Sequence, residues 1–255
     1  MHFLTPYFLD RYEPALLELP HEAVNEAGLA ETAASIQERV LPLYHQLADW
    51  VAQTAADGRV PISLAGDCCA TLPLLAGLQR AGIAPRLLWL DAHGDFNTWE
   101  TTPSGFLGGM PLAMMVGLGE QTWLAALQMD TLPAQDVILA DGRDLDPGER
   151  DLVEQSGIGH VPVWEDVQAA VGEDERPLWV HFDVDVLRLE DVPAVSYPAT
   201  GGPSHAQLRQ LFAHLRGQGR LAAVSLSLYN PNLPGTAESQ AVVLDLLAEL
   251  VGEEL

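Results

Sequence analysis

Short apolar runs alternate along the chain with longer segments in which hydrophobic residues recur at helical spacing. The apolar runs predict strands over residues 60–65, 86–91, 136–141, 160–164, 176–187 and 221–230. The helical spacing predicts helices over residues 30–57, 70–81, 111–128 and 238–251. Strands that alternate with helices build parallel βαβ units with helices on both faces of the sheet. The pattern therefore predicts one α/β domain over residues 1–255, with three layers (α/β/α) and a central, mostly parallel sheet.

Polar side chains stand at the ends of the predicted strands. They are Asp67 with Cys68, Asp91 with His93, Asp141 with Asp144, Asp183 with Asp185, and Asn230. Ligands of open α/β sheets bind beyond the carboxyl ends of the strands. The sequence therefore predicts that its reactive groups gather at one edge of the sheet.

The segment "DAHGD" at residues 91–95 ends a buried strand with two acids and a histidine at alternate positions. Side chains at alternate positions of an extended chain point to the same side. If the extended backbone continues through Asp95, then Asp91, His93 and Asp95 converge on one point. Two carboxylates and an imidazole suit a divalent metal ion.

The segment "HFDVD" at residues 181–185 repeats this pattern with His181, Asp183 and Asp185 on one face. Buried acids on one face are costly unless a cation or a proton neutralises them. Taken alone, Asp183 and Asp185 would equally fit hydrogen-bonded acids that orient a loop. Together with the first segment at the same edge of the sheet, they predict a metal site.

Composition narrows the class of protein. The formal net charge is −24, with twelve basic residues that are all arginine, and such a surface repels the phosphates of nucleic acids. No apolar run reaches the 18 residues of a membrane span. The first residues carry acids and prolines rather than a basic leader, which predicts a cytoplasmic protein. The adjacent cysteines, Cys68 and Cys69, do not form a disulfide framework.

Four motifs resemble, in order and in rough spacing, the signatures of the ureohydrolase family, which contains arginases, agmatinases and formiminoglutamases. They are "GDCC" (66–69), "DAHGDFN" (91–97), "GRDLDPGE" (142–149) and "FDVDV" (182–186), within a match that runs from about residue 60 to residue 231. The resemblance implies an arginase-like α/β/α fold and a binuclear manganese centre. It also implies that a hydroxide bridging the two ions attacks a guanidinium carbon, which agrees with the acidity of water on divalent ions.

The resemblance assigns the metal ligands residue by residue. The family positions hold Asp91, His93, Asp95, Asp183 and Asp185, and Asp95 and Asp183 are also expected to act in catalysis. Cys68 stands where the family has a histidine ligand. A thiolate is a softer ligand than imidazole and shifts the preference from manganese towards zinc or iron. The alternative is that Cys68 is a small core residue and that the first ion has lost a ligand.

The resemblance also implies an amino-acid-like small-molecule substrate. Asn97, Thr102 and Ser104 resemble the residues that hold the substrate α-carboxylate in arginases, and Asp146 resembles the one that faces the α-amino group. Family members commonly form trimers or hexamers, so a homo-oligomer is conceivable, although no surface pattern in this sequence predicts one.

The far end of the expected pocket departs from the family. Gly108 replaces a histidine to which a proton-shuttle role is often given, and Leu228 replaces a glutamate that binds the guanidinium. We expect Gly108 to leave room beside the metals for a bulkier or less basic group. The substrate is therefore expected to carry a modified guanidine, a formimino or an acyl-amine group rather than plain arginine. His181 and Tyr229 are weak candidates for the general acid, and His181 fits better as a residue that orients a ligand.

Two other classes of function stay open on the sequence alone. Loss of two functional positions is also what a metal-binding pseudoenzyme would show, one that recognises an amino acid without turnover. Retention of five ligand positions argues against that decay. A magnesium phosphatase is the third alternative, but the chain has no Gly-rich or Arg-rich phosphate cradle.

Overall fold

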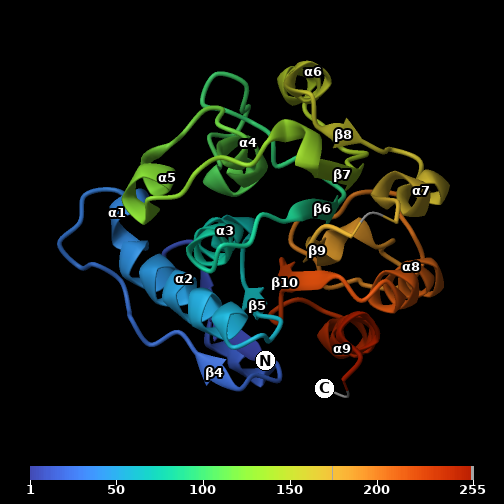
Figure 1. Ribbon diagram of the computed structural model, residues 1–255, viewed down its shortest axis with the longest axis horizontal. Helices are drawn as coiled ribbons and strands as arrows, with labels where there is room; N and C mark the ends of the chain where they lie inside the picture. The colour runs from blue at the N-terminus through green and yellow to red at the C-terminus, as the bar shows by residue number, and fades with distance from the viewer. Residues whose placement is uncertain (174, 254–255) are drawn as a thin grey trace.

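A parallel eight-stranded sheet forms the middle of the protein (Figure 1). The computed structural model describes residues 1–173 and 175–253. The strands lie in the order β4-β1-β5-β10-β9-β6-β7-β8, and every neighbouring pair is parallel. Their bounds are β1 His2–Thr5, β4 Ala23–Val24, β5 Ile62–Ala65, β6 Arg86–Asp91, β7 Val137–Asp141, β8 Gly159–His160, β9 Leu178–Asp183 and β10 Leu221–Ser227. A separate antiparallel hairpin pairs β2 (Tyr7–Phe8) with β3 (Arg11–Tyr12).

Helices cover both faces of the sheet (Figure 1). On one side lie α1 (Ile36–Arg39), α2 (Leu41–Ala56), α3 (Thr71–Arg80), α4 (Pro111–Met115) and α5 (Thr122–Leu127). On the other side lie α7 (Val167–Val171), α8 (His205–Gly217) and α9 (Thr236–Val251), while α6 (Pro147–Ser156) lies near the β8 edge. Short 3-10 helices are η1 (Pro14–Glu18), η2 (Cys68–Ala70), η3 (Leu107–Gly109), η4 (Ala134–Asp136), η5 (Trp164–Asp166) and η6 (Val184–Val186). The predicted three-layer α/β/α class is confirmed.

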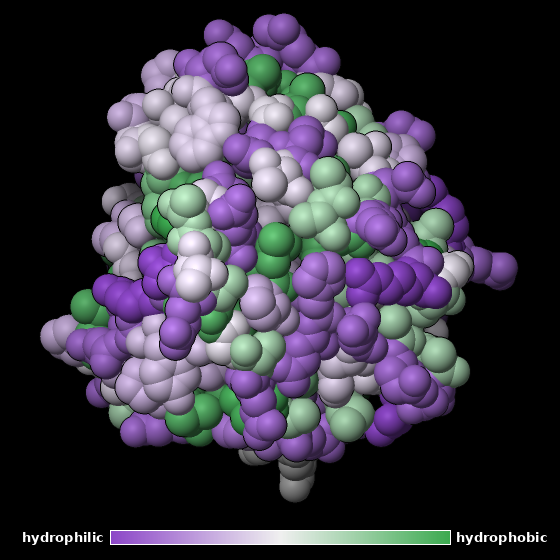
Figure 2. Space-filling view, turned by 90° about the vertical axis from the view of Figure 1, so that its left-hand side faces the viewer, coloured by the Kyte–Doolittle hydropathy of each residue, from purple (hydrophilic) through white to green (hydrophobic). Residues whose placement is uncertain are grey.

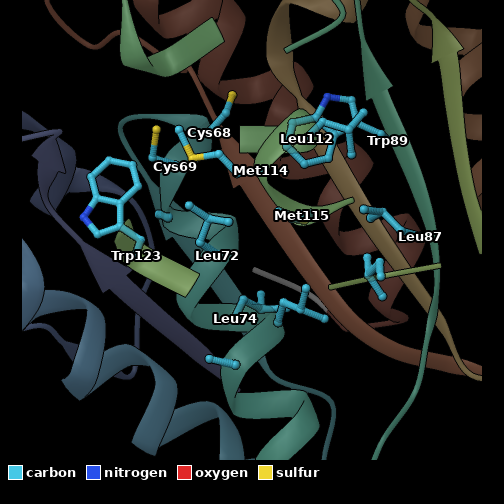
Figure 3. Packing of buried hydrophobic residues seen from close by; sticks show 14 of the residues in the cluster. Cys68, Cys69, Leu72, Leu74, Leu87, Trp89, Leu112, Met114, Met115 and Trp123 are labelled. Carbon is cyan, nitrogen blue, oxygen red and sulfur yellow. The ribbon is translucent and has the colours of Figure 1, made fainter. Parts of the chain in front are cut away.

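The alternation of side chains along β6 explains the two helical layers. Leu87 and Trp89 point into one apolar cluster, with Leu72 and Leu74 of α3 (Figure 3). Leu88 and Leu90 of β6 point into a second apolar cluster, which also contains side chains of α8 and α9. Because successive strand residues face opposite sides, a strand that is apolar throughout is buried on both faces. This is why residues 87–90, within β6, form a continuous apolar run.

Several predicted elements are shorter than the sequence pattern suggested, or are divided in two. The predicted helix over residues 30–57 begins only at residue 36 and is split into α1 and α2, because Pro42 lies in the first turn of a new helix. The predicted helix over 111–128 is two helices, because Gly117 and Gly119 between them have φ values of 89° and 62°. The predicted strand over 160–164 is only the two-residue β8. Strand β1 and the helices α6, α7 and α8 had no sequence prediction.

The two acidic segments do not continue as extended strands, so that expectation is wrong. Strand β6 ends at Asp91, and Asp95 lies in the left-handed region with a φ of 48°. Strand β9 ends at Asp183, and Asp185 lies on η6. Tight turns, rather than strand alternation, therefore bring the later acids back towards the strand ends.

The face over α1 and α5 carries hydrophilic and hydrophobic residues in small groups that are interspersed with one another (Figure 2). Trp99 is the most exposed tryptophan on the surface that the structure describes, and its ring nitrogen donates to Glu120. None of the helices formed by the described residues has the length and apolar character needed to cross a membrane.

Candidate metal centre and active-site cavity

Four adjacent strands in the middle of the sheet carry the polar groups. In the order β5-β10-β9-β6, their carboxyl ends hold Cys68 (just beyond β5), Ser227, Asp183 and Asp91. The last strand in the sequence, β10, is inserted beside β5, so the chain order reverses at this point of the sheet. Ligands of α/β proteins bind where the strand order reverses. The fold therefore places the predicted residues at the expected position.

A first group of possible metal donors lies under this edge. Cys68, Asp91, His181 and Asp183 each offer one donor atom, and these atoms lie within 4.8 Å of one another. The Cys68 thiol donates to Oδ2 of Asp183 over 3.0 Å. The hydroxyl of Ser227 lies 3.1 Å from the Cys68 sulfur and donates to the same Asp183 oxygen. All four donor residues are buried.

The neighbouring cysteine has a different environment. Both cysteines belong to the apolar cluster that contains Met114 and Trp123 (Figure 3), but their thiols have different partners. The Cys69 thiol donates to the carbonyl of Leu107. Only Cys68 therefore faces the acidic group, and both thiols are free.

A second donor group shares one residue with the first. Asp91, His93 and Asp185 each offer a donor atom within 4.8 Å of the others. Nδ1 of His93 lies 3.1 Å from Oδ2 of Asp185 and 3.4 Å from Oδ1 of Asp91. Because Asp91 belongs to both groups, the arrangement is suited to two ions held side by side with a shared carboxylate.

Asp95 lies next to these groups without belonging to either. Its carboxylate is buried, and its Oδ2 atom has no hydrogen-bond partner within the described chain. Oδ2 of Asp185 makes no well-aligned hydrogen bond there, although Nδ1 of His93 lies 3.1 Å from it. Buried carboxylate oxygens of this kind are costly unless a cation contacts them. These two oxygens therefore fit the divalent ions that the donor groups suggest.

The electrostatics of the metal-free protein support this fit. Burial raises the pKa of Asp95 and of Asp183 well above the ordinary value, and neighbouring carboxylates raise both further. Burial also raises the pKa of the Cys68 thiol, with Asp183 adding to the effect. Burial opposes protonation of His93, but contacts with Asp185 and Asp91 raise its pKa to about 12. Divalent ions would replace the protons that these groups hold.

The two weak candidates for a general acid lie outside the cavity. His181 is completely buried against Trp89, with ring centroids 3.8 Å apart, and its Nδ1 lies 2.8 Å from the Ser225 hydroxyl. Burial lowers the pKa of His181 to about 3, so it carries no acidic proton near neutral pH. The Tyr229 hydroxyl lies 2.8 Å from that of Thr236 at the start of α9.

A cavity of about 500 Å³ opens above the donor groups. Cys68, His93 and Asp95 form its floor. The predicted substrate residues Asn97, Thr102, Ser104 and Asp146 all line the same cavity. The structure thus brings the predicted metal and substrate residues to one place, with Asp91, Asp183 and Asp185 buried beneath.

The amino-acid end of the cavity is tied together by hydrogen bonds. The Asn97 amide donates to Oδ2 of Asp146 over 3.0 Å and accepts from the Thr101 hydroxyl. Asp146 also caps the first turn of α6, in a capping box with Glu149. Burial raises the pKa of Glu149 to about 7, although the backbone amides of Phe96 and Asp146 donate to it.

Arg143 fastens the second acidic segment to β7, a role that no sequence motif revealed. Its guanidinium donates to both carboxylate oxygens of Asp141 at 3.0 Å. It also donates to the carbonyls of Asp185, Val186 and Thr200, each at 3.1 Å. A planar guanidinium has several donors in fixed directions, so it can hold two loops at once. Arg143 therefore fixes the backbone that presents Asp185.

The far wall of the cavity contains Phe106, Gly108, Tyr197 and Leu228. The expectation that Gly108 leaves an open space is wrong. A Cβ atom at Gly108 would lie 2.3 Å from Cε1 and 2.4 Å from Cζ of Phe106. The ring of Phe106 thus fills the place of a side chain at position 108. Leu228 has a φ of 60°, an uncommon conformation for a leucine, and is buried at the cavity wall.

The comparisons with known proteins agree with this geometry. The model of the arginase family matches residues 10–252. The chain is 30% identical over 223 residues to the arginase of Bacillus caldovelox, covering 82% of this chain and 74% of that protein. The native structure of a Bacillus caldovelox arginase superposes with a TM-score of 0.82 at 25% identity, over 100% of this chain and 98% of that one.

This chain belongs to the arginase family. Another relative is the N(omega)-hydroxy-L-arginine amidinohydrolase of Streptomyces lavendulae, 37% identical over 183 residues. That match covers 70% of this chain and 63% of the relative, so the chain spans less than two thirds of that relative's length. The predicted ureohydrolase membership is confirmed, and so is the enzyme class, a hydrolase of the arginase kind. Membership of the arginase family also argues against the alternative that the protein is a magnesium phosphatase.

The metal assignment predicts how an isosteric substitution changes metal content. Protein purified with manganese should hold about two divalent ions per chain, and Asp183→Asn should lose at least one of them. The amide keeps the shape of the carboxylate but removes its charge. Elemental analysis measures the stoichiometry, and Asp151→Asn on the exposed face of α6 is the control. Unchanged metal content in Asp183→Asn would show that the acids serve another purpose.

The environment of Cys68 predicts a separate effect on metal preference. Cys68→Ser should weaken binding of one ion, and Cys68→His should restore it with a stronger preference for manganese. A thiol reagent should label Cys68 faster in metal-free protein than in loaded protein. Cys69 is the internal control, because its sulfur faces the Leu107 carbonyl. Equal labelling rates of Cys68 in the two states would favour the alternative of a core cysteine.

Proposed function

We propose that this protein hydrolyses the N-hydroxyguanidino group of an amino acid similar to N-hydroxy-arginine. Water adds to the guanidino carbon, and the bond from that carbon to the side-chain nitrogen breaks. That nitrogen takes up a proton and leaves as a primary amine, and the other product is N-hydroxyurea. The observation that carries the proposal is the contrast between a charged near end of the cavity and an uncharged far wall.

The near end of the cavity supports an amino-acid substrate. Asp146 offers a carboxylate to an α-amino group, and the hydroxyls of Thr102 and Ser104 offer donors to an α-carboxylate. Thr102 and Ser104 lie 3.4 Å apart, oxygen to oxygen, on the loop that rims the cavity. Asn97 keeps Asp146 in place through its amide. These groups would fix the substrate so that its far end reaches the metal centre.

The far wall supports an uncharged reactive group. Phe106 and Leu228 are apolar, and Tyr197 contributes a neutral phenol. Asp67 also lines the cavity, but the backbone amides of Leu9 and Cys69 donate to its two carboxylate oxygens. A guanidinium placed there would have no carboxylate partner at position 228, and a desolvated cation without a partner is unfavourable. An N-hydroxyguanidine is less basic than a guanidine, because its oxygen withdraws electrons. The similarity to an N-hydroxy-arginine amidinohydrolase points to the same group.

The metal ligands proposed are Cys68, Asp91, His93, Asp95, Asp183 and Asp185. Bound divalent ions would supply Lewis acidity and a water that loses its proton near neutral pH. Asp95 would contact an ion through its free Oδ2 atom and hold the attacking water with the rest of its carboxylate, and Asp183 would hold the Cys68 side of the centre. Manganese follows from the hard carboxylate set, and the thiolate would also suit zinc or iron.

Turnover is favoured over binding alone. The family and the relatives that match this chain are named as enzymes, and the chain keeps both donor groups that share Asp91. All of these atoms lie at or directly beneath the floor of the cavity, where the reacting carbon of a bound amino acid would sit.

The uncharged wall predicts the order of substrates. Arginine should be hydrolysed at least about a hundredfold less efficiently than N-hydroxy-arginine, because a buried unpaired cation costs about 3 kcal/mol or more. Release of the amine product by the manganese-loaded enzyme gives kcat/KM for both compounds. Leu228→Glu returns an acid to the wall and should narrow the gap. Efficient release of urea from arginine by the wild-type enzyme would overturn the proposal.

The carboxylate of Asp146, at the amino-acid end of the cavity, predicts a separate effect on substrate binding. Asp146→Asn keeps a side chain that can cap α6 but removes the charge that faces the α-amino group. We expect KM for the amino-acid substrate to rise about tenfold or more, the usual weight of one charged hydrogen bond. An analogue that lacks the α-amino group should show no such change. An equal rise for both compounds would mean that Asp146 acts only on the structure of the loop.

A further inference from the structure

Three aromatic rings run in a row from the β2–β3 hairpin into the cavity. Phe8 stacks on Phe106, with ring centroids 5.9 Å apart and planes inclined by 13°. Phe106 in turn contacts Tyr197, with centroids 5.5 Å apart. Tyr197 then meets His93 edge-on at 6.4 Å. The row therefore ends with a phenol beside a candidate metal ligand.

The Tyr197 hydroxyl is available to a ligand. Among the described residues, the phenol oxygen of Tyr197 has no hydrogen-bond partner, whereas the Tyr229 hydroxyl is bonded to Thr236. Its side chain lines the same cavity as Leu228 and is 39% exposed. A tyrosine phenol carries its proton at neutral pH. The hydroxyl can therefore both donate and accept a hydrogen bond.

The loop that carries Tyr197 is held on both sides. Before it, Val195 pairs with Tyr229 in an antiparallel bridge, and the Asn230 amide donates to the Ser196 hydroxyl over 2.9 Å. These contacts join the loop to the residues that directly follow Leu228. After it, Arg143 donates to the carbonyls of residues 199 and 200. The phenol is thus fixed relative to Leu228 before any substrate binds, which lowers the entropic cost of a contact.

We propose that Tyr197 is a specificity-determining residue that hydrogen-bonds the hydroxyl of an N-hydroxyguanidine, with Phe106 and Leu228 excluding water around it. The inference rests on the proposed function and names the residue that reads the distal group. The oxygen of this group donates and accepts, as the phenol does. An unsubstituted guanidinium offers only donors and a positive charge, which a neutral phenol cannot balance. Phe106 also keeps position 108 closed, so no other side chain can take this role there.

The test compares one hydroxyl group on the enzyme with one on the substrate. Tyr197→Phe keeps the ring and its contact with Phe106 but removes the oxygen. We expect kcat/KM for N-hydroxy-arginine to fall about tenfold while the low value for arginine stays unchanged. Binding of ornithine, which has only the amino-acid end and an amine, should be unaffected in calorimetry. Tyr12→Phe, an exposed tyrosine that lines no described part of this cavity, is the matched control.

The outcomes separate the inference from the function on which it rests. A wild-type preference for N-hydroxy-arginine that Tyr197→Phe reduces supports both. The same wild-type preference, retained in Tyr197→Phe, overturns the role of Tyr197 and leaves the proposed function in place. An equal loss for both substrates, or weaker ornithine binding, also overturns it, because the residue would then be structural. A wild-type enzyme that does not hydrolyse N-hydroxy-arginine overturns both.

Discussion

Burial of several carboxylates and a thiol at the carboxyl ends of the central strands is the constraint on which the site depends. Acids packed this closely destabilise one another unless protons or cations neutralise them. The half-buried guanidinium of Arg143 is already engaged with Asp141 and with backbone carbonyls, including that of Asp185. Protons or divalent cations can meet this need, so metal binding at this site would be coupled to the stability of the fold.

The sequence predicted the centre of this protein better than its periphery, for a physical reason. Strand β6 matches its predicted range of residues 86–91, because a strand buried on both faces must be apolar throughout. The helical spacing over residues 111–128 correctly predicted helical structure, but it did not show that Gly117 and Gly119 divide this segment into two helices. The edge strand β4 buries too few side chains to leave a pattern, and β8 overlaps only the first residue of its predicted range, residues 160–164.

The candidate site shows the same division between local and long-range information. The motifs identified all ten predicted residues that now lie in or under one cavity, although the reason given for Asp95 and Asp185 was wrong, since turns rather than strand alternation place them. Phe106, Arg143 and Tyr197 were not found. Their contribution comes from contacts with residues distant in the sequence or, for Phe106, from a ring that folds back over Gly108. No single motif encodes such contacts.

The contrast between the two ends of the cavity suggests how one fold can serve substrates of different basicity. Charged groups at the amino-acid end, such as Asp146, can bind the unreactive part of the substrate and hold its other end over the metals. Binding energy gained away from the reacting carbon can then be used to position it. Under the proposed function the far wall does not need to attract a cation, so Leu228 and Phe106 can exclude water there. Exclusion of water strengthens every polar interaction that remains, including the one that a single phenol such as Tyr197 can offer.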